Sequence, residues 1–417
     1  MSNGTDSEPM TSAVRSDRLR WEQIIMVCAL VGTSQMTWGA LIPALPQYAL
    51  KFGASALLLG LIVSSFGVGR LLVNIPAGML LQRVPARALL LTVTGLLAAV
   101  TLVTGFLDSV VLLVVARFVA GVLGGAAVTI GLAVLTQRTT AATRGSILST
   151  VQAVQLAGAA LGPVLGGVVL TVSTLPFVFV VAAVPLLLVI AWALVRPDAH
   201  FWSDQYGRDV PPGIGVATGA ADQSAESDER QRLSARRLAA VCVLAFGIFF
   251  VRFGGDQSLI PLLAYDQGKL TPLTLGLAYG LTTVVSLLLL PWIGRRLNSG
   301  HRVGLLVIPT ALAAGLICLY PLADMPWFFG GLIVSTGVLS GIGSLVPGVL
   351  LADQTPRSRV GTAMGVFRSV GDVGAVVGPL VLGAVLDGGG AGPATLLLAA
   401  VSLAALAGYF LLSRQSV

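Results

Sequence analysis

The chain has 417 residues, of which 55% are hydrophobic and only 10% are charged. Soluble domains carry about 25% charged residues, so this sequence cannot supply the polar surface that a soluble core of this size needs, and its solvent must be lipid. The net charge of +7 does not indicate a nucleic acid partner, because the arginines lie in short loops between apolar segments, as orientation signals do.

Twelve apolar segments follow one another, each close to the ~20 residues that a helix needs to cross a bilayer. In the loops and tails, nearly all lysines and arginines fall on one side, and only Lys51 and Lys269 fall on the other. Positively charged loops face the cytoplasm, so we expect both termini there. The segments cover residues 22–46, 55–81, 88–107, 110–135, 145–172, 174–195, 238–264, 272–293, 303–323, 326–352, 360–386 and 391–413.

One long loop divides the twelve segments into two sets of six. It is rich in Gly, Ser and Asp, carries charges of both signs and has no apolar periodicity, which is typical of a mobile linker. The predicted fold is therefore an all-α integral membrane protein of two six-helix bundles. Its predicted parts are a cytoplasmic N-terminal tail at 1–21, a bundle at 22–195, a cytoplasmic linker at 196–237, a second bundle at 238–413 and a C-terminal tail at 414–417.

The two halves are copies of one unit. Residues 121–167 repeat at 337–383 with a constant offset of 216 residues, so that Gly158-x-x-x-Gly162-Pro163 returns as Gly374-x-x-x-Gly378-Pro379. We therefore expect two pseudo-symmetric bundles. Two similar bundles that rock about a site between them are what alternating-access transport requires.

Four motifs resemble those of one protein family. They are Leu41-Ile-Pro-Ala-Leu-Pro-Gln-Tyr48, Gly78-Met-Leu-Leu-Gln-Arg83-Val-Pro-Ala-Arg87, Arg117-Phe-Val-Ala-Gly121 and Gly158-x-x-x-Gly162-Pro163-x-x-Gly166-Gly167. With them the chain resembles the major facilitator superfamily over about 24–413, and within it the drug:proton antiporter branch with twelve spans. The second motif departs from the family pattern G-x-x-x-D-R-x-G-R, because Gln82 replaces the Asp and Pro85-Ala86 replaces a Gly.

Ionisable side chains at membrane depth are costly, so each is a functional candidate by default. In two places an arginine and an aspartate stand four residues apart. On an α-helix the two side chains of such a pair share a face and can touch. The six residues at membrane depth are Arg70, Arg117, Arg252, Asp256, Arg368 and Asp372.

Two interpretations of the pairs Arg252–Asp256 and Arg368–Asp372 stay open. An aspartate beside an arginine stays ionised, whereas an aspartate left alone in an apolar site takes up a proton. Movement of each arginine would then make its aspartate a proton carrier that is coupled to the conformational cycle. Alternatively, each pair is a fixed ion pair that braces two helices. For Arg117, the family resemblance implies a part in proton transfer or in holding the outer gate.

The first half lacks charge where the second half has it. At the repeat offset Gln152 corresponds to Arg368, and near the first segment, where the offset becomes 218, Trp38 corresponds to Asp256. Structural needs common to both halves do not explain charges in only one. Arg70 either lines the cavity or satisfies helix-end carbonyls. The other candidate substrate contacts are Gln35, Trp38, Gln152 and Gln155. The alternative for each of them is interhelical hydrogen bonding or core packing.

Glycines and arginines supply the candidate gating residues. The glycines and the proline of the fifth segment permit a close, kinked helix crossing that would seal or flex the outer side. Equivalent loops of the two halves carry arginines that would hold the cytoplasmic side closed, with an acid at the end of the tenth segment as a partner. Alternatively, these arginines act as topology signals alone. These candidates are Gly158, Gly162, Pro163, Gly166, Gly167, Arg83, Arg87, Arg295, Arg296 and Asp353.

The predicted function is proton-coupled export of small amphipathic organic molecules by alternating access in a cytoplasmic membrane. Four arginines against two aspartates at membrane depth favour a neutral or anionic substrate over a lipophilic cation. The alternative is proton-coupled uptake or exchange of a small organic acid, with Arg252 or Arg368 binding its carboxylate. A more remote alternative is a non-transporting membrane receptor on a carrier fold.

An enzyme is not expected, because the sequence has no nucleophile–base set, metal cluster or phosphate loop. It also has no nucleotide motif, so the energy source should be an ion gradient. We expect no cofactor and no metal site. The expected partners are the substrate, protons and the lipid bilayer, and we expect the chain to act as a monomer.

Overall fold

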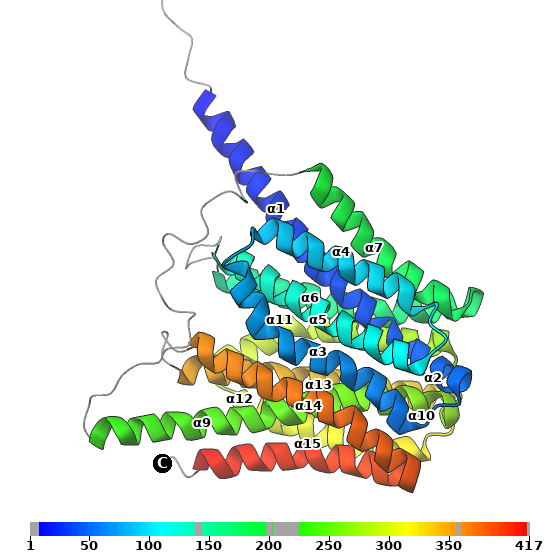
Figure 1. The fold of residues 1–417 in the computed structure, drawn as a ribbon. Coiled ribbons are helices and arrows are strands. Elements are labelled where there is room, and N and C mark those ends of the chain that lie inside the picture. The colour runs from blue at the N-terminus through cyan, green and yellow to red at the C-terminus, as the bar shows by residue number, and fades with distance from the viewer. Residues whose placement is uncertain (1–7, 138–143, 197–201, 203–224, 356–359, 415–417) are drawn as a thin grey trace, which may run out of the picture.

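The computed structural model describes residues 8–137, 144–196, 202, 225–355 and 360–414. Within these ranges the chain is helical and forms no strand (Figure 1), as the sequence predicts. The first half contains α1 (Glu8–Gly39), α2 (Leu41–Phe52), α3 (Ala56–Leu81), α4 (Ala86–Thr104), α5 (Val110–Gln137), α6 (Arg144–Val172) and α7 (Leu175–Val195). The second half contains α9 (Ala225–Phe249), the π-helix η1 (Phe250–Leu259), α10 (Ile260–Asp266), α11 (Pro272–Asn298), α12 (Arg302–Ile317), the 3₁₀-helix η2 (Tyr320–Leu322), α13 (Pro326–Gln354), α14 (Val360–Gly389) and α15 (Ala391–Arg414).

Twelve stretches of the described chain are long and apolar enough to cross a membrane. Their bounds follow the prediction closely, as in Val110–Leu135 and Ala391–Ser413. The helices differ from the prediction at their starts, since α1 begins at Glu8 and α9 begins at Ala225, inside the predicted linker. A formed helix extends at little cost, so it continues into the charged residues before the apolar stretch. The bounds of the five predicted parts stay predictions.

Apolar side chains cover the outer faces of the helices as well as the interior. Leu72, Ile75, Leu188, Leu288 and Leu396 are all more than half exposed, which suits a surface that is solvated by lipid. Inside, one hydrophobic core is built mainly from α1 to α7 and two others from the helices of the second half. Each half therefore has its own packed interior.

Two equivalent helix crossings join the halves, α3 with α14 and α6 with α11. Gly276 of α11 lies so close to α6 that an added β-carbon would stand 2.5 Å from the Pro163 carbonyl oxygen, and Gly60 of α3 meets the Pro379 carbonyl of α14 in the same way. Gly276 lies 216 positions after Gly60, and Pro379 lies 216 positions after Pro163. The sequence repeat is thus a structural two-fold repeat.

These crossings lie at the end of the molecule opposite the two termini (Figure 1). Gly383 of α14 abuts Ala56, the first residue of α3, and Gly167 of α6 abuts Pro272, the first residue of α11. Toward the termini the helices of the two halves diverge. The structure is therefore closed between the halves at the far end, which we call the closed end, and splayed at the end that carries the termini.

The first and seventh spans are both interrupted. The first breaks between α1 and α2 near Pro43, and the seventh passes through η1 just before Pro261. Proline lacks an N–H group and its ring clashes with the carbonyl four residues earlier. Next to it, the Ile260 N–H donates to the carbonyl of Gly255, five residues back. Such π-helical turns are frequent at functional sites, and here the turn contains Arg252 and Asp256.

Candidate functional site

An ion pair joins the two halves near the middle of α3 and α14. The Arg70 guanidinium donates to the Asp372 carboxylate through Nη2 at 2.5 Å and through Nε at 3.0 Å. The Asp372 side chain is 1% exposed and that of Arg70 is 26% exposed. In this pair Asp372 is therefore buried, whereas Arg70 is partly accessible.

A short polar network supports Asp372. Asn74, one turn after Arg70 on α3, donates to the second carboxylate oxygen of Asp372 at 3.2 Å. Thr129 of α5 donates in turn to the Asn74 side-chain carbonyl at 3.4 Å. A buried carboxylate needs several donors to offset its lost hydration, and α3 supplies three of them. Sequence reasoning missed Asn74, although a polar residue four positions after Arg70 on an apolar helix was a usable signal.

The structure does not form the ion pairs within one helix that the i, i+4 spacing predicts. Asp372 binds Arg70 instead of Arg368, and within the described chain no acid lies within 4.0 Å of Arg368 or Arg252. Two physical reasons account for this. Arg70 reaches Asp372 with two nitrogens across a close helix crossing, and the π-helical turn changes the geometry on which the prediction for Arg252 and Asp256 relied.

The predicted charged residues nevertheless gather in one cluster. Arg70 interacts electrostatically with both Arg252 and Arg368, while Asp256 acts on Arg252 and Asp372 acts on Arg368. The site thus combines three arginines and two aspartates from α3, η1 and α14. Of the two alternatives for Arg70, the described hydrogen bonds go to an aspartate and not to a helix-end carbonyl, and lining of the cavity stays a prediction.

Asp256 lies half-buried in η1. The Tyr279 hydroxyl, on α11, donates a hydrogen bond to the Asp256 backbone carbonyl, so the neighbouring helix satisfies one of the backbone groups of the irregular turn. This contact fixes the turn against α11. The sequence did not single out Tyr279, because nothing in its spacing relates it to η1.

Aromatic rings surround the Arg70 end of the cluster. The Arg70 guanidinium carbon lies 5.6 Å from the Phe249 ring centre and 5.5 Å from that of Phe253. Trp38 packs on Phe253 across the two halves with ring centres 5.5 Å apart, and on Phe66 at 6.0 Å. These distances are in the range of favourable cation–π and aromatic contacts. Trp38 is buried in this structure and packs between the halves, which matches the core-packing alternative.

Arg117 lies apart from this cluster, in the core of the first half. Its side chain is 4% exposed, its guanidinium lies 5.1 Å above the Phe66 ring, and its Nε has no hydrogen-bond partner among the described residues. An incompletely satisfied buried arginine is costly. It therefore keeps its place as a functional candidate, with Phe66 as its link to Trp38.

The glycines of the fifth span make the close crossings that the sequence predicts. Gly158 abuts Gly32 of α1, Gly162 lies against Met36 and Gly39, and Gly166 packs on Pro43. Gly167 and the Pro163 carbonyl lie against α11 of the second half, while the Pro163 ring packs near Gly39 of α1. One helix face thus binds α1 and another closes on the opposite half. Their gating role stays a prediction.

At the closed end, a further contact between the halves was not predicted. The Asp387 carboxylate, near the end of α14, accepts hydrogen bonds from the backbone N–H groups of Ala56 at 2.8 Å and Leu57 at 2.9 Å. These are unpaired donors of the first turn of α3, where a negative charge is favoured. An acid at a span end looked unremarkable in the sequence, because its partner lies 331 residues away.

Among the described residues, the arginines near the termini make no contact that joins the halves. Arg87 donates to the Ala193 carbonyl at the end of α7 at 2.8 Å, within its own half. Arg83, Arg295 and Arg296 are exposed, and Arg296 stacks over Trp292. The side chain of Asp353, their predicted partner, lies outside the described residues. A latch at this end stays a prediction.

The structure describes the side chains of only some of the candidate glutamines. Gln35 and Gln155 are half-buried, and the Gln35 side-chain amide lies 3.4 Å from the Ser34 hydroxyl. The side chain of Gln152 lies outside the described residues. The role of Gln35 and Gln155 as substrate contacts stays a prediction.

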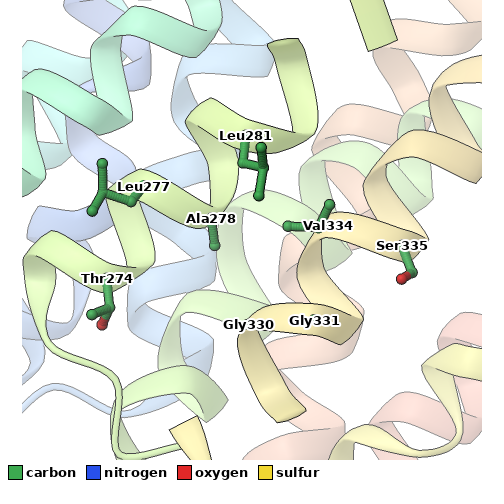
Figure 2. Close-up of a pocket in the computed structure, with 8 residues that line it drawn as sticks. All are labelled: Thr274, Leu277, Ala278, Leu281, Gly330, Gly331, Val334 and Ser335. Atoms are coloured by element: carbon green, nitrogen blue, oxygen red, sulfur yellow. The ribbon is translucent and has the colours of Figure 1, made fainter. Parts of the chain in front are cut away.

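A separate apolar cavity of about 430 Å³ opens between α11 and α13 (Figure 2). It contains none of the candidate residues and no ionisable group, and Leu277 and Leu281 on its wall are exposed on the exterior. We assign it no part in the site. Its walls are formed by Thr274, Leu277, Ala278, Leu281, Gly330, Gly331, Val334 and Ser335.

The family model of the Major Facilitator Superfamily matches residues 27–344 and 241–416, which together cover nearly the whole chain. The protein belongs to this superfamily. It is therefore a multi-pass membrane transporter and not an enzyme, and the predicted fold is confirmed.

Solved structures and curated relatives agree with this assignment. The fold matches a bacterial homolog of the human lysosomal transporter Spinster, in an inward-facing and unoccupied conformation, with a TM-score of 0.72, 13% identity and 98% of each chain covered. It matches the nucleoside transporter NupG with a TM-score of 0.71 and 11% identity over 93% of this chain and 98% of that one. These identities are low enough that the matches show the fold alone.

Among curated proteins, the Multidrug resistance protein MdtG of Yersinia enterocolitica is 31% identical over 132 residues, which is 31% of each chain. MdtG of Escherichia coli is 30% identical over 130 residues, 30% of this chain and 31% of that one. The similarity thus spans about a third of the length of these relatives.

Proposed function

We propose that this transporter exports small amphipathic organic molecules, neutral or anionic, in exchange for protons. The observation that carries the proposal is the ion pair between Arg70 and the buried Asp372. It lies between the two halves, which must move relative to each other in alternating access. At the equivalent position of the α6–α11 crossing, the repeat offset places Ser286 and Leu156, so symmetry alone does not account for the pair.

The proposed coupling follows from the position of the pair. When α3 and α14 separate, Asp372 loses Arg70 and is left in an apolar interface, where a carboxyl group binds a proton more readily. When they close again, Arg70 returns and displaces that proton. Asp256 would exchange a second proton in the π-helical turn, with Arg252 and Arg368 restoring the charge. Proton release is thereby tied to closure of the crossing.

Export of amphipathic molecules is supported by two observations. The chain matches in part a protein that is named for multidrug resistance, MdtG. The aromatic rings of Phe249 and Phe253 beside the charged cluster offer apolar contact next to charge. We further propose that the protein is a monomer in a cytoplasmic membrane with both termini in the cytoplasm, and that no nucleic acid is involved.

The proposal is tested by flux into reconstituted vesicles under an imposed pH gradient, with a panel of cationic, neutral and anionic compounds. We expect Asp372→Asn to reduce gradient-driven flux to the level of protein-free vesicles, and Asp256→Asn to reduce it in part. Asp108→Asn is the matched control, because this acid pairs with Lys51 within one half at the surface. If both membrane variants keep wild-type flux, the coupling proposal fails.

A second candidate function is proton-coupled uptake or exchange of a small organic acid. It is favoured by Arg368, whose side chain is exposed and has no acid within 4.0 Å among the described residues. The same vesicles separate the two functions, because export in exchange for protons accumulates solute in the acidic compartment, whereas uptake together with protons accumulates it in the alkaline compartment. Binding of solute without any flux would instead indicate a receptor.

A further inference from the structure

Two arginines of the cluster lack a direct counter-charge. Arg70 is bound to Asp372, but no described acid comes within 4.0 Å of Arg252 or Arg368. Both repel Arg70 electrostatically. With Asp256 included, three arginines face two aspartates, so the cluster carries one positive charge in excess when all five groups are ionised.

Arg368 is the arginine of the cluster that a ligand can reach. It lies one helical turn from Asp372 on the same face of α14, on the side toward the termini, where α3 and α14 diverge (Figure 1). Asp372 is buried by the crossing, whereas the Arg368 side chain is exposed. Arg368 therefore faces the space that opens between the halves.

An accessible cation with no counter-charge is costly at membrane depth. Part of that cost is recovered when an anion binds, because charge-assisted hydrogen bonds to a guanidinium are strong and frequently bidentate. Next to the cluster, the half-buried Phe249 ring stacks on Phe253 with centres 6.0 Å apart. An apolar surface thus adjoins the uncompensated charge.

We infer that Arg368, with Arg252 as the second uncompensated charge, binds the anionic group of the transported molecule, so that the substrate is an amphipathic organic monoanion. Its apolar part lies against the aromatic rings that surround the cluster. One negative charge on the ligand balances the one excess positive charge. This inference rests on the proposed function and narrows its substrate class.

The test compares three naphthalene derivatives of similar size that differ in charge: 2-naphthoate, 2-naphthamide and 2-naphthylmethylammonium. Their binding is measured by quenching of tryptophan fluorescence on the purified full chain in nanodiscs, without a pH gradient. We expect 2-naphthoate to bind about tenfold more tightly than 2-naphthamide, and the cation to bind weakest. Arg368→Gln should remove this preference and leave 2-naphthamide binding intact, while Arg368→Lys should retain most of it.

Arg237→Gln is the matched control, since this arginine lies exposed near the start of the seventh span and should keep the preference. Equal binding of naphthoate and naphthamide to the wild type, no naphthoate binding at all, or a preference that survives Arg368→Gln would each overturn the inference. Retained naphthamide binding shows that the variant is folded. Because no proton gradient is applied, anion binding without proton-driven flux would reject the coupling proposal alone.

Discussion

At the scale of the residue, Asp372 has Arg368 one turn away on its own helix but binds Arg70, which is far more distant in sequence. Position at membrane depth marked Asp372, Asp256 and four arginines as candidates, and spacing along a chain reveals neighbours on the same helix. It could not reveal a partner 302 positions away. Only the close crossing of α3 and α14 brings Arg70 to the carboxylate, and that crossing depends on packing of whole helices.

The energetics of this pair can be measured with a double-mutant cycle on thermal unfolding in detergent. We expect Arg70→Gln to destabilise the protein by about 2 kcal/mol, between the values for buried and exposed pairs, because it leaves the Asp372 charge unpaired. The double variant Arg70→Gln/Asp372→Asn should recover part of this loss, because it removes both charges. Losses that add without interaction would contradict a direct pair.

At the scale of the element, hydropathy predicted the spans well, but it did not predict where the helical backbone becomes irregular. Pro43 and Pro261 correspond to each other at the offset of 218 residues, but their effects differ. Near one, the first span breaks into α1 and α2, and before the other, the seventh span adopts π-helical turns. Local sequence does not decide between these outcomes, because each depends on which neighbouring group satisfies the freed backbone, as Tyr279 does for η1.

The contact of Asp387 with the first turn of α3 should stabilise the closed end. We expect Asp387→Ala to open this end more often, since two backbone donors lose their acceptor at a cost of about 1 kcal/mol. The reporter is a single cysteine at Ser64, which is buried where α3 meets Val376, in a protein otherwise free of cysteine. Labelling by a membrane-impermeant maleimide should become several-fold faster.

Asp108→Ala is the control for this experiment, because Asp108 lies at the same end but pairs within one half. An unchanged labelling rate in Asp387→Ala would show that the contact does not hold the closed end.

The glycine contacts make a second prediction about the same crossings. A methyl group at Gly276 would stand 2.5 Å from the Pro163 carbonyl, so Gly276→Ala must push α6 and α11 apart, and Gly60→Ala must do the same for α3 and α14. We expect both to raise the labelling rate of the Ser64→Cys reporter. Gly331→Ala, where an added β-carbon meets nothing within 4 Å, should leave the rate unchanged; equal rates in all three would contradict the prediction.

At the scale of the whole molecule, the sequence predicts the architecture almost completely. Lipid requires every spanning segment to satisfy its own backbone, so long apolar runs leave few alternatives to helices, and the repeat at 216 residues relates the halves. The sequence does not predict which conformation of the transporter the structure adopts. Which end is closed depends on small free-energy differences between two arrangements of the same bundles.

Orientation in the membrane is open to direct test. An even number of spans places both termini on one side, and the charge of the loops decides which side that is. Single cysteines at Lys51 and Lys269 should react with an impermeant reagent on intact cells. Cysteines at Arg83 and Arg295 should react only after permeabilisation. The reverse pattern would place the termini outside and invert the proposed direction of every step.

The two crossings between the halves share their glycines but differ in their polar contacts. The α3–α14 crossing carries the Arg70–Asp372 pair and the Asp387 contact, while the residues of the α6–α11 crossing that correspond to the ion pair are Ser286 and Leu156. Motion between the halves should therefore be asymmetric. The α6–α11 crossing should act as a hinge, and the α3–α14 crossing should be the one whose polar contacts form and break. Protonation of Asp372 should therefore loosen α3 from α14 without changing the glycine contacts between α6 and α11.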